Sequence, residues 1–109
     1  MGYAAAADLI FTSRAVDAEE ALKLGLLNRL VPAAELIDAA VAYANEMTRW
    51  PPVALRVSKR VLQHNTDAPL EEALRYESAG LYYARRAPND VKESRDSFLE
   101  KRPGVYTGT

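Results

Sequence analysis

Prolines and glycines divide this chain into helix-sized segments, and this punctuation constrains the fold more than any other feature of the sequence. Between the breaks, apolar residues recur at helical spacing, whereas the alternation that is typical of strands is rare. The clearest apolar stripe follows Pro32 and consists of Leu36, Ile37, Ala40, Val41, Ala44 and Met47. Such a stripe is typical of an amphipathic helix. The sequence therefore predicts a mainly α fold of roughly five or six helices.

Helix-capping signals place the first two helices. The alanine-rich stretch 3–10 favours a helix because alanine has the highest helix propensity. Asp17 precedes the next one as an N-cap, with Glu20 at the position of a capping box. Gly25 is suited to end this helix, which we expect over 18–24. For the apolar run 26–31 we expect an extended, buried connector, and one strand-like pairing within it stays open.

Prolines place the later helices. Pro32 can open a helix that ends near Trp50, and the next helix frays near residues 64–65. Pro69 is suited to the first position of a further helix. Pro88 breaks the chain, after which Asp90 and Glu93 form a second capping-box pattern for a helix over 91–101.

Composition limits the classes of protein to which the chain can belong. Hydrophobic residues make up 49% and charged residues 27% of the 109 residues, which predicts one globular unit over 1–109 with a modest core. The net charge of −1 gives no reason to expect nucleic-acid binding. No apolar run approaches the ~20 residues of a membrane span. The first residues lack the basic region of a signal peptide, so we expect a cytoplasmic protein.

The residues alone show no catalytic or metal site. The chain has no cysteine, and its one histidine, His64, cannot form a multi-histidine site. The serines lack a nucleophile-elbow context, and the glycines form no phosphate-binding loop. The basic pairs at 85–86 and 101–102 are typical of solvated surface. For most of the aromatic residues Tyr76, Tyr82, Tyr83 and Phe98 we expect core packing.

Four stretches, in order, resemble the crotonase (enoyl-CoA hydratase/isomerase) family. Residues 9–31, LIFTSRAVDAEEALKLGLLNRLV, are similar to a family pattern in which Ser13 replaces the usual glycine. PPVALRVSKRV at 51–61 and LEEALRYE at 70–77 resemble its next two segments. FLEKRPGVYTG at 98–108 resembles its terminal signature. The order and spacing fit along the chain, which is therefore similar to the family's helical C-terminal region.

This resemblance implies an acyl-CoA enzyme whose catalytic residues lie outside the chain. In the family, backbone N–H groups of a spiral ββα core stabilise an enolate, and carboxylates of that core move protons. The matched region lacks this core, so no catalytic residue is assigned here, and neither a metal nor a covalently bound cofactor is implied.

The resemblance also implies roles in binding and assembly. The family's helical tail supports trimers and covers the acyl-CoA site, often from a neighbouring subunit. By motif position, Phe98 and Lys101 would lie near the nucleotide end of coenzyme A, and Tyr82 is a weaker aromatic match. An aromatic face suits adenine, and an ammonium offers a point charge to phosphate.

Three hypotheses follow. The first is a truncated crotonase-family chain that contributes to the acyl-CoA site and to a homo-oligomer without catalysis of its own. The second is one part of an active assembly, whose missing N-terminal half is on another polypeptide or belongs to the same protein outside this sequence. The third is a helical self-association module that has left acyl-CoA chemistry. Unpartnered apolar helix faces predict self-association in each case.

Overall fold

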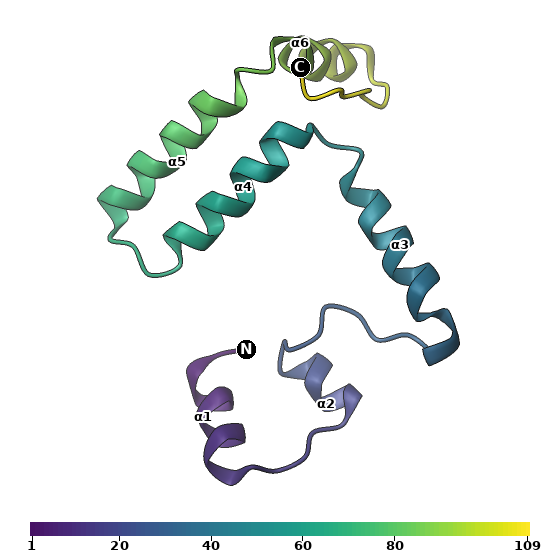
Figure 1. Ribbon diagram of the computed structural model, residues 1–109, viewed down its shortest axis with the longest axis vertical. Helices are drawn as coiled ribbons and strands as arrows, with labels where there is room; N and C mark the ends of the chain where they lie inside the picture. Colours follow the sequence, from purple (N-terminus) through teal and green to yellow (C-terminus); the bar gives the residue numbers. More distant parts are fainter. The chain divides into compact units, whose positions relative to one another are not determined.

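The computed structural model describes residues 1–109 as helices and connecting segments, with no strand (Figure 1). The mainly α prediction is therefore confirmed. The helices are α1 (Tyr3–Thr12), α2 (Ala18–Lys23), η1 (Ala33–Glu35), α3 (Leu36–Met47), α4 (Pro52–Asn65), α5 (Leu70–Ala84) and α6 (Pro88–Glu100), where η1 is a 3₁₀ turn.

The chain forms two compact units, Met1–Ala40 and Val41–Thr109. The expectation of a single unit over residues 1–109 stays a prediction.

In the first unit, α1 and α2 form where the sequence predicts them. The Asp17 carboxylate accepts a hydrogen bond from the Glu20 backbone N–H at 2.8 Å, as an N-cap does. At the other end of α2, Gly25 has φ +76°, and the Leu26 N–H donates to the Ala21 carbonyl at 2.9 Å. This arrangement is a Schellman motif, whose left-handed residue is usually glycine.

The capping-box prediction at α2 is half wrong. The Glu20 carboxylate does not return to the N-cap but accepts two hydrogen bonds from the Arg14 guanidinium, at 2.7 and 3.0 Å. Arg14 also binds Asp8 of α1 at 3.0 Å. The guanidinium competes successfully for this carboxylate because both groups are ionised and two parallel N–H donors match the two carboxylate oxygens.

Between α2 and α3 the backbone is irregular, so the strand-like pairing considered for residues 26–31 is absent. The expectation that this connector is buried is also wrong, because Leu26, Leu27 and Leu30 are exposed. Pro32 precedes the 3₁₀ turn η1, and α3 continues directly from it. The predicted apolar stripe lies on α3, but Leu36, Ile37, Val41 and Met47 are all exposed. The helix is therefore amphipathic without a partner for its apolar face.

In the second unit, α4 and α5 pack side by side as a helical hairpin (Figure 1). The contact is close at Gly80, where an added Cβ would lie 2.9 Å from the side chains of both Val57 and Val61. Pro52 occupies the first turn of α4. Pro69 is the N-cap residue that precedes α5, and it does not take the first helical position that the sequence predicts for it. At the hairpin end, His64 stacks on the Tyr76 ring with centroids 3.9 Å apart.

Helix α6 begins earlier than predicted. Pro88 does not break the chain but stands in the first turn, where its missing N–H costs nothing. Asp90 and Glu93 therefore lie inside the helix, and the capping-box prediction for them is wrong. Both carboxylates bind the chain end instead.

The core is smaller than the modest core that the composition predicts. Val53 and Ala87 are the buried hydrophobic residues, and Asp90 and Ser97 are the buried polar ones. The core-packing prediction for the aromatic residues is wrong, because Tyr82 and Phe98 are 77% and 81% exposed, and Tyr76 and Tyr83 are exposed as well. Within the second unit, α4 and α5 are the helices that pack extensively against each other, and many large apolar side chains of the chain are exposed.

Candidate functional site

The tail (residues 103–109) folds back along α6. Asp90, which is only 3% exposed, accepts hydrogen bonds from the Thr107 and Gly108 N–H groups at 2.8 and 2.9 Å. In return, the Thr109 carbonyl accepts from the N–H groups of Asn89 and Asp90 at the start of α6, at 3.0 and 3.2 Å. These reciprocal bonds satisfy groups that a helix N-terminus otherwise leaves unpaired.

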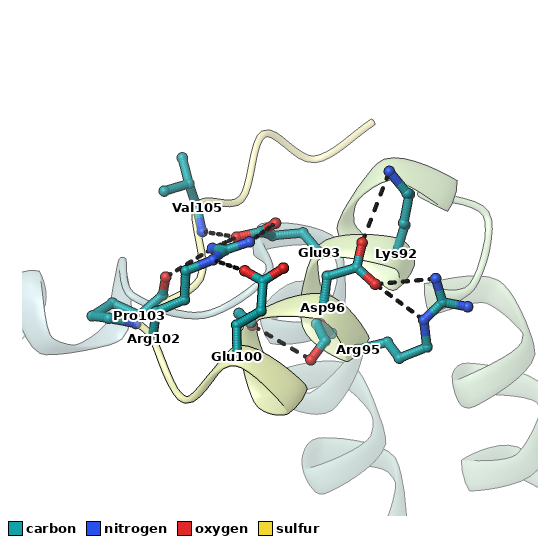
Figure 2. A network of polar contacts seen from close by, with 10 residues as sticks. Lys92, Glu93, Arg95, Asp96, Glu100, Arg102, Pro103 and Val105 are labelled. Carbon is teal, nitrogen blue, oxygen red and sulfur yellow. Dashed lines mark hydrogen bonds and ion pairs between the residues drawn. The ribbon is translucent and has the colours of Figure 1, made fainter.

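A second carboxylate, Glu93, fixes the start of the tail (Figure 2). It accepts two hydrogen bonds from the Arg102 guanidinium and one from the Val105 N–H at 2.9 Å. The bonds from Arg102, followed by the bond from Val105, lower the pKa of Glu93 to about 2. The same bonds, with a further one to Glu100, raise the pKa of Arg102. The pair is therefore ionised throughout the physiological range.

Helix α6 and the tail enclose one side of a cavity, which we call the Phe98 cavity. Its volume is about 790 Å³. It is lined by Arg49, Trp50, Pro51, Ser94, Ser97, Phe98, Arg102, Pro103, Gly104 and Tyr106. Tyr106 packs closely against Gly104, because an added Cβ at this glycine would lie 2.4 Å from the end of the Tyr106 side chain. Three aromatic side chains and two guanidinium groups thus border one space.

Of the residues singled out from the sequence, Phe98 lines the cavity and Lys101 lies one helical turn further on. Lys101 ends α6 with φ 54°, a left-handed conformation that is uncommon for residues other than glycine. Its ammonium forms no ion pair with this chain. Tyr82 lies on α5 and does not line the cavity.

Other cavity residues were not predicted from the sequence. Arg49 and Trp50 follow α3, where the sequence indicates only a helix end before Pro51. Arg102 was interpreted as solvated surface, but it binds Glu93. Tyr106 belongs to the terminal signature at 98–108, and this motif is the only sequence signal from which its place at the cavity could have been predicted. Proximity between residues 50 and 98 depends on the tertiary structure and has no local sequence pattern.

The described side chains include no group of three or more histidine, cysteine, aspartate or glutamate residues placed to hold a metal ion. None of the helices combines the length and the apolar character needed to cross a bilayer. The Phe98 cavity itself offers the aromatic faces of Trp50, Phe98 and Tyr106 and the guanidinium groups of Arg49 and Arg102.

Comparison with known families gives one match that covers the chain, described as Enoyl-CoA hydratase/isomerase and extending over residues 1–109. The chain belongs to the enoyl-CoA hydratase/isomerase family. The crotonase resemblance deduced from its motifs is thus confirmed.

Individual relatives agree with this assignment. A carnitinyl-CoA dehydratase of Salmonella agona is 33% identical over 104 residues, a match that covers 93% of this chain and 40% of the relative. The crystal structure of an enoyl-CoA hydratase from Mycobacterium marinum matches with a TM-score of 0.89 at 33% identity, covering 100% of this chain and 43% of that one. An enoyl-CoA hydratase from Bacillus anthracis gives a TM-score of 0.91 at 29% identity, covering 99% of this chain and 42% of the other.

The chain spans about 40% of the length of the curated relatives that it matches. An all-helical chain of this extent fits the C-terminal helical region of the crotonase fold, as the motifs predict.

Proposed function

We propose that this chain is the C-terminal portion of an acyl-CoA enzyme, and that it supplies one edge of the coenzyme A site and an oligomer contact. The observation that carries the proposal is the Phe98 cavity, together with Lys101 at the end of the same helix, whose ammonium forms no ion pair with this chain. The family's name refers to enoyl-CoA thioesters, and the relatives named above are a carnitinyl-CoA dehydratase and enoyl-CoA hydratases.

The proposed binding mode assigns a role to each predicted residue. The Phe98 side chain is 81% exposed and offers an apolar face to the adenine ring of coenzyme A. Lys101 offers a point charge to a phosphate group. Tyr82, on α5, would contact the nucleotide only from a neighbouring subunit or after a rearrangement. No covalently bound cofactor enters this proposal, because the thioester itself is the substrate.

Calorimetric titration of the chain with coenzyme A tests the site. We expect Lys101→Ala to weaken binding by roughly tenfold through the loss of one charge-assisted contact. Phe98→Ala should also weaken binding, because the adenine ring loses its apolar partner. Lys59→Ala, which removes an exposed lysine of α4, is the matched control and should bind as the parent does. Equal affinity in all three variants would refute the assignment of Phe98 and Lys101.

Catalysis, in this proposal, belongs to the part of the enzyme outside the chain. We expect no turnover of a short enoyl-CoA by the chain alone, since its described residues form no catalytic constellation. Co-expression with an N-terminal half of a family member should restore hydration or isomerisation if the two halves assemble. Turnover by the repurified chain alone would contradict the proposal.

A second candidate function is self-association without acyl-CoA chemistry, and the exposed apolar stripe of α3 favours it. By family resemblance, a trimer-based homo-oligomer is expected in a cytoplasmic enzyme. Sedimentation at micromolar concentration separates the candidates when it is combined with the titration above. An oligomer that does not bind coenzyme A favours the second function, and a clean monomer that binds it favours a coenzyme A site alone.

A further inference from the structure

The α4–α5 hairpin bears a second cavity, which we call the arginine pocket. Its volume is about 450 Å³, and it shares no lining residue with the Phe98 cavity. Arg56 and Arg60 reach it from consecutive turns of α4, and Arg86 reaches it from the residues that follow α5. The other lining residues are Val53, Val57, Tyr83 and Gly108.

The charge of this pocket is not compensated within the chain. None of its three arginines forms an ion pair with a carboxylate, whereas Arg14, Arg75, Arg95 and Arg102 each do. Arg86 instead lies over the Tyr83 ring, 5.8 Å from its centroid. The nearby carboxylate of Asp90 is occupied by the tail.

The placement of these cations has an energetic consequence. Arg56 and Arg60 are four residues apart on one helix, and like charges at this spacing destabilise a helix. Because no carboxylate offsets their repulsion, an anion in the pocket would lower the free energy of the folded chain more than an anion beside a paired arginine.

The geometry points to a phosphate-bearing polyanion as the occupant of the arginine pocket. Guanidinium groups present a planar fork of donors that matches phosphate oxygens in pairs, and three of them suit a ligand with at least two negative charges. Inorganic pyrophosphate and the diphosphate of a nucleotide share this chemistry. The pocket is separate from the site assigned to Phe98 and Lys101, so the proposal does not depend on that assignment.

Calorimetry with inorganic pyrophosphate, at low and at moderate salt, tests the arginine pocket. We expect binding that weakens as salt rises and that stabilises the chain against heat. The double variant Arg60→Gln/Arg86→Gln should bind at least roughly tenfold more weakly. Arg75→Gln is the matched control, since it removes an arginine of α5 that is already paired with Glu71. Circular dichroism checks that each variant keeps its helix content.

Coenzyme A is the second arm of the experiment and separates the two sources of the phosphate groups. Arginine-dependent binding that is tighter for coenzyme A assigns the pocket to a nucleotide, and tighter binding of pyrophosphate assigns it to a free polyanion. The absence of pyrophosphate binding at millimolar concentration overturns the proposal, and so does equal affinity in the double variant. A loss of coenzyme A binding in Lys101→Ala but not in the double variant would keep the function proposed above and exclude this pocket from it.

Discussion

The two units of the chain are stabilised in different ways. In Met1–Ala40 no side chain is buried, and the polar contacts that join α1 to α2 run from Arg14 to residues six positions away. A longer contact is the 3.5 Å bond from the Met1 amino group to the Gly25 carbonyl. In Val41–Thr109 all four buried residues are present, and the bonds from the tail reach carboxylates up to eighteen positions away.

This difference shows how a helical chain with a small core can still hold its terminal segments in place through hydrogen bonds. The first unit uses helix caps, which are local and weak, and the second uses a buried carboxylate that ties the tail to α6. Two of the four buried residues in the second unit are polar, so specific hydrogen bonds replace part of the usual apolar core. Both units leave large apolar side chains of their helices exposed.

The largest expected effect comes from breaking the tail contact of the second unit. Asp90→Ala leaves the Thr107 and Gly108 N–H groups without their acceptors, and each loss costs on the order of 1–3 kcal/mol. Urea denaturation should show the destabilisation, and amide exchange should show both N–H groups unprotected. Asp67→Ala, at an exposed aspartate, is the control and should change neither measurement. Persistent protection of the two amides would contradict this account.

A matched pair of glycine substitutions sharpens the comparison, because each unit ends a helix with a non-glycine residue in the left-handed region. Ser13 has φ 49° and Lys101 has φ 54°. We expect Ser13→Gly and Lys101→Gly each to stabilise the chain by about 1 kcal/mol, since glycine adopts this conformation without strain.

The control for this pair is Ser58→Gly inside α4, which should destabilise by about 0.5 kcal/mol because glycine is a poor helix former. Thermal unfolding measures all three variants. If either terminal glycine fails to raise the stability, the left-handed residue there is not strained.

Each unit contains a carboxylate whose pKa is lowered by an arginine, so the acid sensitivity of the two units can be compared. Hydrogen bonds from Arg14 lower the pKa of Glu20, and those from Arg102 and the Val105 N–H lower the pKa of Glu93 from 4.5 to about 2. A carboxylate whose pKa is lowered by folding stabilises the folded chain at pH values above its ordinary pKa. This stabilisation is lost as the pH falls through the pKa that the carboxylate has in the folded chain. For Glu93 the loss should therefore extend from about pH 4.5 down to about pH 2.

Denaturation followed between neutral pH and about pH 2 checks this expectation. Glu93→Gln should reduce the free energy of unfolding that the second unit loses on acidification. Glu20→Gln should reduce the corresponding loss in the first unit. Glu77→Gln, at a carboxylate of α5 without an ion pair, serves as the reference. An unchanged pH dependence in Glu93→Gln would show that this carboxylate is not engaged in solution.

The smallest expected effect is that of Arg14→Ala, which removes the ion pairs between α1 and α2 in the first unit. Because Arg14 joins Asp8 to Glu20 at an exposed position, its loss should raise amide exchange in α2 a few-fold and leave α4 and α5 unchanged. Arg75→Ala, which breaks an exposed pair within α5, should not affect α2. Faster exchange throughout the chain would indicate that the two units unfold together.

Local patterns in the sequence determined most of the secondary structure. The Asp17 cap, the Gly25 stop and the prolines before α4 and α5 act within a few residues, so their effects could be deduced without a fold. The family membership was also evident from the sequence, because four motifs occur in the right order. The assignment of Phe98 and Lys101 rests on the same motifs and stays a prediction.

Tertiary structure alone decided the roles of Asp90, Glu93 and Arg102. In the sequence, Asp90 and Glu93 have the spacing of an ordinary capping box, and Arg102 belongs to a basic pair that is typical of solvated surface. These residues bind the tail only because the chain reverses direction after α6. The arginine pocket depends in the same way on the α4–α5 hairpin, which brings Arg86 beside Arg56 and Arg60. Short-range hydrogen bonding and propensity specify helices, whereas the free energy of burying or exposing a charge depends on segments that are distant in the sequence.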